Sequence, residues 1–326
     1  MISLGKLSIA DVRISYTAKN SQNTKSNLLI IMQRTPEGYP LPKTILLASG
    51  GARGICYIGA LQLLEKKGCL ANVKTWAGVS VGALTATCAA IGYTINEISE
   101  ITLRFNFGSL KNINELGPLR LLETYGLESG DALRRFINAL FHIKGYSHDM
   151  KFKELPTGHD LKLWVTNLTK GKLELYSRAT TPDAQIAVAL RASACIPVVY
   201  DPVMNDEGDI LVDGAVIDAF PILYMSEKER KEMIGIRATY PFGNRKITSF
   251  FNYIQKCVLL GFESRNTSAI HIYKNQIICI ELGHISPADF DISLEVKEAA
   301  VQLGEDYTHD FLQAYRQQKP ARRYSI

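Results

Sequence analysis

Two consecutive units, each made of a short apolar run, a glycine turn and a helical stretch, dominate the first hundred residues. Residues 44–48 form an apolar run typical of a buried strand, and after a glycine turn apolar residues recur at helical spacing up to Gly68. The second unit predicts a strand at residues 73–77, a tight turn at residues 78–82 and a helix at residues 81–93. Consecutive units of this kind indicate a parallel sheet covered by helices, so we expect an α/β fold.

The rest of the chain continues this pattern. Thr94 and Glu97 predict a capping box for a helix that ends near Phe105. Further strands are expected near residues 28–32, 198–200, 210–212, 234–239 and 276–281, and a hairpin at residues 161–167 and 172–177. Further helices are expected near residues 133–141, 181–192, 226–233 and 292–316. Ser129 would cap the first of these helices, and Thr181 and Pro182 would open the second. No internal repeat or low-complexity linker is visible, so one α/β domain is the simplest account.

Composition and charge exclude several classes of protein. With 46% hydrophobic residues, the chain of 326 residues can form a packed core and is not a disordered polymer. The net charge is +5, but residues 1–43 and residues 314–326 each contribute +4, which leaves −3 for the remainder. No stripe of arginine and aromatic residues accompanies these charges, so nucleic acid is not an expected partner. We interpret the basic C-terminal segment as a solvated end, with contact to an anionic membrane surface as the alternative.

Cysteine usage and hydropathy bear on location and on metals. The six cysteines lie singly in apolar stretches without a Cys-x-x-Cys pair or paired histidines, so we expect buried thiols, a reducing compartment, no metal site and no cofactor. Lys6, Asp11 and Arg13 interrupt the N-terminus, which therefore lacks the apolar region of a signal peptide. The uncharged residues 75–96 are rich in glycine and threonine and divide into a strand and a helix, which argues against a transmembrane span.

The second glycine turn carries the most specific chemical motif. Gly78-Val79-Ser80-Val81-Gly82 is a Gly-x-Ser-x-Gly sequence that follows a predicted strand and opens a predicted helix. A sharp turn there lifts the Ser80 hydroxyl out of the sheet edge, and the two glycines prevent clashes with the neighbouring strand and helix. The positive end of the helix would stabilise an oxyanion nearby. We interpret Ser80 as a candidate nucleophile, and the alternative is a turn of small residues that serves packing alone.

The turn after the first strand, residues 49–54, has two interpretations. It could cradle a phosphate in a nucleotide-binding enzyme, but it lacks a P-loop lysine, and no ribose-binding acid follows the second strand. Its backbone N–H groups could instead stabilise a developing oxyanion, because both turns lie at the carboxyl ends of neighbouring strands. The favoured interpretation is an oxyanion hole that includes Gly50, Gly51, Ala52, Arg53 and Gly54.

A serine nucleophile also needs a base. No histidine lies in a motif, and His284 is the only acceptable candidate for the histidine of a Ser-His-Asp triad, which would lie late in the chain on a loop after an acid. Asp213, Gly214 and Ala215 follow an apolar strand, so the acid would lie at a strand end beside a glycine that admits a neighbouring backbone. An isolated Asp-Gly pair is most often a turn.

Taken in order, Gly-Gly-x-Arg-Gly, Gly-x-Ser-x-Gly and Asp-Gly-Ala resemble the motifs of the patatin-like phospholipase family. Residues 192–197, with Pro202 and Val203, are similar to a further stretch of that family, and the resemblance covers residues 41–221. It implies a patatin-like three-layer fold with a central, mostly parallel sheet flanked by helices. Residues 1–40 would be a lead-in and residues 41–326 the domain, in which residues 222–326 complete the fold or form a partner surface.

The resemblance also implies an activity and a role for each motif. Members are lipid acyl hydrolases of the phospholipase A or lysophospholipase type that use a Ser-Asp dyad without histidine or metal. Ser80 would be the nucleophile, Asp213 the base, and residues 50–54 the oxyanion hole, with Arg53 near the phosphate or bracing the loop. Gly78, Gly82, Gly214 and Ala215 would support the dyad. The substrate would be a phospholipid at a membrane surface, and the alternative is a catalytically silent lipid-binding or regulatory module.

Three departures from the family pattern qualify this interpretation. Ser49 replaces a usual glycine, Ala194 and Cys195 shift the order of small residues, and Asp218 and Ala219 stand where Asn-Asn is common. The last departure could change how the loop after Asp213 is held.

A second, weaker resemblance concerns the setting in which the protein acts. Residues 165–167, 176–177 and 181–182 are similar to the bacterial secreted-effector branch of the family. That branch implies delivery into a host cell and activation by a eukaryotic protein, whereas the competing view is lipid turnover in the cytoplasm of the producing cell. Either way we expect the protein to be peripheral at membranes. The apolar helix faces within residues 110–141 predict packing, with a lid as the alternative. Head-group and chain-position preference do not follow from the residues.

Overall fold

The structure is a computed structural model that describes residues 32–110, 117–239, 267–283 and 291–318, together with positions 247, 253, 256, 257, 260, 285, 286 and 289. The strand expected at residues 28–32 lies outside the described residues except for Met32. Within the described part, a short antiparallel pair comes first, made of β1 (Gln33–Arg34) and β2 (Pro40–Leu41). The expected division at residue 40 stays a prediction.

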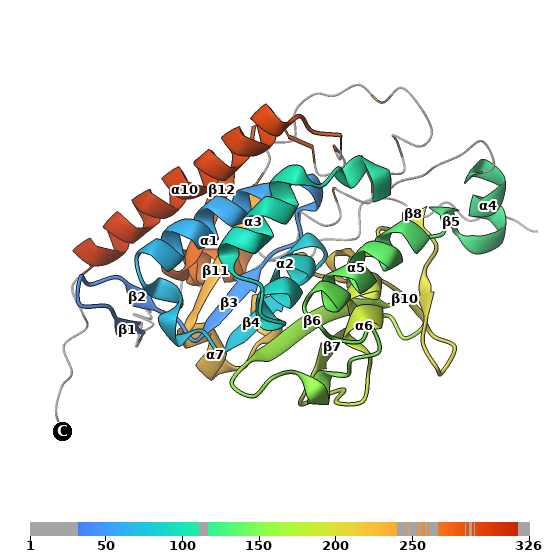
Figure 1. Ribbon diagram of the computed structural model, residues 1–326, viewed down its shortest axis with the longest axis horizontal. Helices are drawn as coiled ribbons and strands as arrows, with labels where there is room; N and C mark the ends of the chain where they lie inside the picture. The colour runs from blue at the N-terminus through green and yellow to red at the C-terminus, as the bar shows by residue number, and fades with distance from the viewer. Residues whose placement is uncertain are drawn as a thin grey trace, which may run out of the picture. The chain divides into compact units, whose positions relative to one another are not determined.

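A mixed sheet forms the centre of the fold (Figure 1). Its strands are β3 (Thr44–Leu47), β4 (Thr75–Gly78), β6 (Asp160–Asn167), β7 (Lys172–Ser177), β9 (Val203–Met204), β10 (Ile210–Asp213), β11 (Met233–Thr239) and β12 (Ile277–Glu281). The order is β12-β11-β3-β4-β6-β10-β9, and β7 pairs with β6. The strands from β12 to β6 are parallel, whereas β7, β9 and β10 are antiparallel to their neighbours. The predicted α/β class with a mostly parallel sheet is therefore confirmed.

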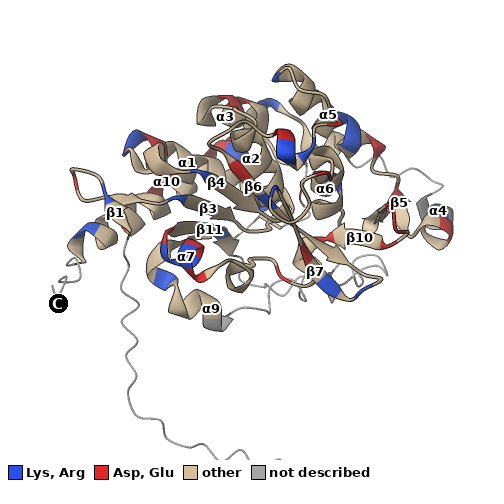
Figure 2. Ribbon diagram, turned by 90° about the horizontal axis from the view of Figure 1, so that it is seen from below, with Lys and Arg blue, Asp and Glu red and all other residues tan. Residues whose placement is uncertain are grey.

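Helices cover both faces of the sheet. One face carries α1 (Cys56–Lys66), α2 (Val81–Ala90), α3 (Ile95–Arg104), α5 (Asp131–Ile143), α6 (Ile186–Ser193) and α10 (Leu294–Gln317). Figure 2 shows α7 (Glu227–Lys231) and α9 (Thr267–Ile272) on the opposite side of the strands. A short parallel pair, β5 (Gly126–Glu128) with β8 (Val198–Tyr200), lies beside α4 (Gly117–Thr124) at one end. These three layers match the predicted architecture.

The core lies between the central strands and the helices that pack directly on them. Ile45, Leu46 and Leu47 of β3 are completely buried, as parallel strands covered on both faces must be. Helices α1 and α10 approach so closely that a Cβ atom on Gly59 or Gly304 would overlap a carbonyl oxygen of the other helix. The long C-terminal helix therefore packs directly on the helix that follows β3.

The capping box at Thr94 is confirmed. The Glu97 N–H donates to the Thr94 hydroxyl (3.2 Å), and the Thr94 N–H donates to the Glu97 carboxylate (2.7 Å). The uncharged residues 75–96 form β4 and α2, as predicted. Within the described ranges, no helix combines the length and the apolar composition needed to cross a bilayer.

Two helix starts were predicted wrongly. Helix α5 begins at Asp131 after Gly130, whose φ of 77° ends the preceding turn, and the Ser129 hydroxyl accepts from Asp131 N–H inside that turn. Helix α6 begins at Ile186, not at Pro182. The Thr181 hydroxyl instead accepts from Ser177 N–H (3.1 Å) and closes the turn after β7. In both places a hydroxyl forms a local turn, which competes with capping.

Candidate active site

The strands β4 and β10 lie end to end along one side of β6, and this register creates the site. The last residue of β4, Gly78, pairs with Leu163 of β6, and the last residue of β10, Asp213, pairs with Val165. Because β4 is parallel to β6 and β10 is antiparallel, their carboxyl ends point toward each other. Two residues of a strand span about 7 Å, so the turn after β4 meets the end of β10. Sheet pairing alone therefore brings Ser80 next to Asp213.

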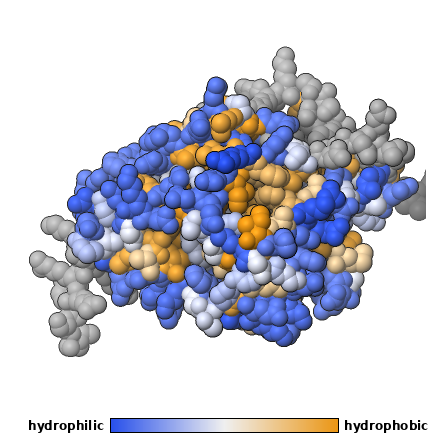
Figure 3. All heavy atoms as spheres, in the orientation of Figure 1, coloured by the Kyte–Doolittle hydropathy of each residue, from blue (hydrophilic) through white to orange (hydrophobic). Residues whose placement is uncertain are grey.

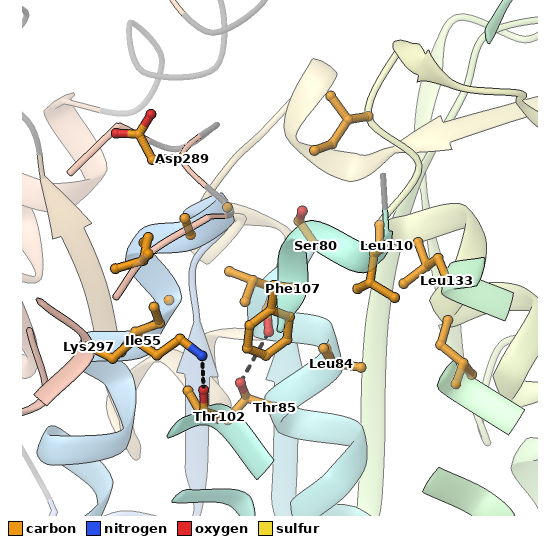
Figure 4. Close-up of a pocket in the computed structure, with 18 of the residues that line it drawn as sticks. Ile55, Ser80, Leu84, Thr85, Thr102, Phe107, Leu110, Leu133, Asp289 and Lys297 are labelled. Carbon is orange, nitrogen blue, oxygen red and sulfur yellow. Dashed lines mark hydrogen bonds between the residues drawn. The ribbon is translucent and has the colours of Figure 1, made fainter. Parts of the chain in front are cut away.

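Ser80 occupies a sharp turn between β4 and α2. Its φ of 57° and ψ of −123° are unusual for a residue with a side chain, and such conformations concentrate at functional sites. The Ser80 N–H donates to the Ser193 hydroxyl (3.2 Å), which itself donates to the Trp164 carbonyl oxygen (2.8 Å). A buried serine on α6 thus fixes the turn to β6. Figure 4 shows Ser80 at the head of α2, where the positive end of the helix lies.

The glycines on either side of Ser80 have the steric role predicted for them. A Cβ atom on Gly78 would overlap the backbone of Gly82, and one on Gly82 would overlap the carbonyl oxygen of Leu47. A Cβ atom on Gly54 would be 2.5 Å from the side chain of Val81. The two glycine turns therefore pack against each other, as their place at neighbouring strand ends predicts.

Asp213 is a buried carboxyl group with few partners. It is 1% exposed, and its Oδ1 accepts from Ala215 N–H (2.9 Å). Its Oδ2 is buried without a hydrogen bond of normal geometry from the described part of the chain. Burial raises the pKa of Asp213 to about 7, although the nearby Ser80 hydroxyl and the Ala215 amide act in the opposite direction. A base with a pKa near neutrality suits proton transfer. A catalytic hydrogen bond, such as one between the Ser80 hydroxyl and Asp213, often shortens only when substrate binds.

The backbone around Asp213 is held from both sides. The Asp213 N–H donates to the Cys195 carbonyl oxygen (2.9 Å), so the small-residue segment after α6 fixes the end of β10. A Cβ atom on Gly214 would be 2.5 Å from the Trp164 carbonyl oxygen, which explains a glycine directly after the acid. The shifted small residues, Ala194 and Cys195, therefore still support the Asp213 turn.

The loop after β3 reaches the same cavity. Residues Gly51–Ile55 form a 3-10 helix, and the first N–H groups of any helix lack acceptors within it. Gly51, with a φ of 55°, and Ala52 both line the cavity that contains Ser80. Arg53 is 4% exposed, and its Nε donates to the Gly50 carbonyl oxygen (3.3 Å). Of the two roles suggested for Arg53, this contact supports bracing of the loop.

The remaining departures from the family pattern, Ser49, Asp218 and Ala219, lie in two loops that contact each other. The Ser49 N–H donates to the Ala219 carbonyl oxygen (2.8 Å), so the loop after Asp213 is tied directly to the loop after β3. Asp218 is buried, and its Oδ1 accepts from the N–H of Phe220 (2.8 Å). The hydrogen bond between Ser49 and Ala219 joins two backbone groups and depends on neither side chain, whereas the contact of Asp218 uses its carboxylate.

An apolar cavity opens beside Ser80 (Figure 4). With its open mouth it encloses about 880 Å³, and its apolar lining includes Ile55, Leu84, Phe107, Leu110, Leu133 and Ile137. Figure 3 shows hydrophobic residues gathered in the middle of the molecular face seen there, with hydrophilic residues around them. The apolar face of α5 thus packs against its neighbours and also lines the cavity. The sequence did not indicate that the apolar residues of the cavity wall lie at the site.

Lys297 of α10 also lines this cavity, although no sequence motif marks it. Its ammonium group donates to the carbonyl oxygens of Thr102 (3.1 Å), Leu103 (3.1 Å) and Phe105 (2.6 Å). Burial lowers the pKa of Lys297. Because its three donors are all used at the end of α3, Lys297 joins α10 to α3 and shapes the cavity wall (Figure 4).

The residues around the cavity favour acyl transfer. Among the described residues that line it, none is a histidine, and His284 lies outside the described residues. The described part of the chain also holds no group of three or more histidine, cysteine, aspartate or glutamate residues arranged to bind a metal ion. The cavity combines a strained serine, a glycine loop at a helix N-terminus and an apolar wall, and the buried carboxyl group of Asp213 lies next to that serine. This is the set that ester cleavage by a serine requires.

Comparison with known proteins places the chain in a family. The family model described as "Patatin-like phospholipase" matches residues 45–226. The probable lipid hydrolase 463L of Invertebrate iridescent virus 6 is 30% identical over 196 residues, which cover 58% of this chain and 67% of that protein. The uncharacterized protein R571 of Acanthamoeba polyphaga mimivirus is 29% identical over 278 residues, covering 80% and 91% of the two chains.

A solved structure supports the same fold. VipD from Legionella pneumophila superposes with a TM-score of 0.56 at 20% identity, covering 87% of this chain and 70% of VipD. The matched family model spans both the Gly-x-Ser-x-Gly turn and the Asp-Gly-Ala turn, and the fold is the one that the sequence predicted. This chain belongs to the patatin-like phospholipase family.

Proposed function

We propose that the protein hydrolyses carboxylic esters of membrane phospholipids through a Ser80-Asp213 dyad, as a phospholipase A or lysophospholipase. The observation that carries this proposal is the end-to-end meeting of β4 and β10, which places a serine in a strained turn beside a buried carboxyl group. No histidine among the described residues lines the cavity, so the carboxylate of Asp213 is the base available to Ser80.

The chemistry follows from this arrangement. The Asp213 carboxylate accepts the hydroxyl proton as Ser80 Oγ attacks the ester carbonyl carbon. Negative charge then develops on the carbonyl oxygen, where the amides of Gly51 and Ala52 and the positive end of α2 stabilise it. As the ester C–O bond breaks, the protonated Asp213 gives this proton to the leaving oxygen, so the alcohol departs as a lysophospholipid or a glycerophosphodiester, and the fatty acyl group stays on Ser80. Asp213, again a carboxylate, then deprotonates a water molecule that attacks the acyl carbonyl carbon. The proton passes to Ser80 Oγ as the fatty acid is released.

The cavity supports a lipid substrate. Its wall is formed by aliphatic and aromatic side chains from α2, α5 and the segment after α3, and it begins at Ser80. A long acyl chain can be removed from water there while its ester group stays at the dyad. A silent lipid-binding module on the same fold would use this cavity too, so turnover has to be measured directly.

The test measures fatty-acid release by the unchanged protein, by Ser80→Ala and by Asp213→Ala, with a chelator present. The substrates are phosphatidylcholine vesicles and a water-soluble short-chain ester. Ser147→Ala, in an exposed turn after α5, is the matched control. We expect release that needs Ser80 and Asp213 but not Ser147, and that survives the chelator. Equal release by Ser80→Ala would refute the dyad, and no release on either substrate would favour the binding module.

An effector role with a eukaryotic activator stays a prediction. The likeness to VipD concerns the fold, and nothing in the site requires a second protein. Repeating the vesicle assay with and without eukaryotic cell extract tests this prediction. A strong stimulation by extract would support it, whereas equal rates would favour lipid turnover in the producing cell.

A further inference from the structure

A second apolar hollow lies beside the catalytic cavity, and one short segment separates the two. Ala194 and Ile196 line the catalytic cavity, whereas Pro197 and Val198 line the second hollow, and Tyr200 borders both. The segment of residues 194–200 is therefore a thin partition. Whatever covers the second hollow therefore lies close to the wall of the catalytic cavity.

An exposed apolar row borders this second hollow. The Leu168 N–H donates to the Ile210 carbonyl oxygen (2.8 Å), and Met204 of β9 pairs with Ile210 from the other side. Residues directly opposite each other on paired strands share one face, so the three side chains form a continuous row. Leu168 is 49% exposed and Met204 is 68% exposed. We call the surface made by the exposed Tyr125, Leu168 and Met204 and the half-buried Pro197, Val198 and Ile210 the rim patch.

Backbone strain is concentrated in the same patch. Besides Ser80, the non-glycine residues with positive φ in the described part of the chain are Tyr125 (68°) and Val198 (70°). These two lie side by side, because Gly126, the neighbour of Tyr125, pairs with Val198. A β-branched residue at positive φ is a strained exception, and such strain marks functional segments. Here it accompanies a Tyr125 side chain that is 62% exposed.

The charges beside the rim patch are paired. Arg120 forms an ion pair with Asp201 next to the partition. Lys170, which follows Leu168 by two residues, contacts both Glu207 and Asp209 at 2.6 Å. These two cations are thus neutralised by acids, so the patch suits an uncharged apolar environment better than a strongly anionic surface.

We propose that the rim patch inserts into the surface of a phospholipid bilayer and holds the mouth of the catalytic cavity against it. The inference rests on the proposed lipid acyl hydrolase function. Its occupant is a membrane because only the partition of residues 194–200 separates the patch from the cavity that contains Ser80, where a lipid substrate must arrive. Tyr125 contributes an aromatic ring with a polar end, the kind of side chain favoured at the boundary between lipid and water.

The experiment uses the full chain with Ser80→Ala, so that binding is measured without turnover. Binding to phosphatidylcholine vesicles is measured by co-sedimentation at two salt concentrations. The proteins compared are the Ser80→Ala parent and the same protein that also carries Met204→Glu or Leu168→Glu. The matched control is Ile143→Glu. Ile143 is 67% exposed and is the last residue of α5, whereas the patch residue Tyr125 lies before the first residue of that helix. Urea unfolding of each variant reports whether the fold is retained. Hydrolysis of a water-soluble short-chain ester is measured in parallel with Ser80 intact.

We expect Met204→Glu and Leu168→Glu to weaken vesicle binding about tenfold or more, because each places a charge where an apolar side chain leaves water. Ile143→Glu should bind as before, and added salt should change binding little. The hydrolysis rate of the short-chain ester separates the dyad proposal from the membrane proposal. Loss of this rate in Ser80→Ala tests the dyad, and a water-soluble substrate does not need the patch. Equal binding by all variants, or no binding by the parent protein, would overturn the inference. Size-exclusion chromatography that shows the parent protein as a dimer and Met204→Glu as a monomer would also overturn it, because it would assign the patch to a second copy.

Discussion

Replacing Asp213 by asparagine should stabilise the folded protein above neutral pH, even though it removes the proposed base. The carboxyl group is 1% exposed, and burial raises its pKa from 3.8 to about 7. The folded state therefore binds the proton more tightly than the unfolded chain. The stability that Asp213 contributes is fully present below pH 3.8 and is lost as the pH rises through about 7. Asparagine has a similar size and cannot ionise, so it escapes this loss.

The magnitude follows from the two pKa values. Each tenfold difference in proton affinity corresponds to about 1.4 kcal/mol, so the full loss for Asp213 is about 4 kcal/mol. Between pH 5 and pH 9, about 3 kcal/mol of it should appear, because part of the loss has already occurred by pH 5. For a protein whose total stability is on the order of 5–15 kcal/mol, this difference is large.

The assay compares urea unfolding of the unchanged protein and of Asp213→Asn at pH 5, 7 and 9. Other carboxyl groups titrate equally in both proteins, so the difference between the two free energies of unfolding isolates Asp213. Equal slopes against urea would show that both unfold between comparable states. Ser80→Ala serves as the second control, because it removes a neighbour but leaves the titrating group in place.

A difference that stays constant from pH 5 to pH 9 would refute the reasoning. It would mean that Asp213 keeps an ordinary pKa, and hence that solvent or an additional donor reaches Oδ2. A difference that falls with rising pH would give the wrong sign and would require a cation near the carboxylate. Either result would remove the argument for a base poised near neutrality.

Three further predictions test other parts of the site and fold. The kcat/KM for a short-chain ester should rise with pH and level off above about 7, where Asp213 is a carboxylate, and a profile without a step near pH 7 would contradict its role as base. Gly59→Ala should cost about 1–3 kcal/mol of unfolding free energy, since the new methyl group meets the Val301 carbonyl in α10, whereas Gly283→Ala, with open space around it, should change little. Lys297→Met should cost about 1–3 kcal/mol in a urea titration, because three carbonyl oxygens at the end of α3 lose their donor, and an unchanged midpoint would show that water replaces it.

Periodicity and glycine placement were sufficient to predict the centre of the fold. The strands at residues 44–48 and 73–77, the hairpin after residue 160 and the last helix all lie where the patterns placed them, within one to three residues. These elements are buried on defined faces, so their hydrophobic pattern is strong. The starts of α5 and α6 were predicted wrongly because Ser129 and Thr181 bond to nearby turns, and a sequence does not show which of two local hydrogen bonds will form.

The positions of Ser80 and Asp213 were predictable, whereas the walls of the cavity were not. Both residues lie in short motifs at strand ends, where glycines leave a signature. Lys297, Phe107 and Leu133 reach the same cavity from three separate elements, and none of them belongs to a motif. Ser193 lies within residues 192–197, which the sequence marked as similar to the family, but its contact with the Ser80 amide depends on how α6 packs on β6. Long-range packing decides such contacts, and local sequence carries little information about it.

The register of β6 explains why two residues can suffice where many serine hydrolases use three. Because β4 and β10 share one side of β6, the serine turn and the acid meet along a single line of hydrogen bonds. A slip of β10 by one residue would bring Val212 to the position of Asp213 and turn the carboxyl group to the other face of the sheet. The contacts of Asp213 with Cys195 and of Gly214 with Trp164 oppose such a slip from both sides. In the proposed dyad, the acid held at this register lies next to the serine, so no intermediate histidine would be needed to span the gap.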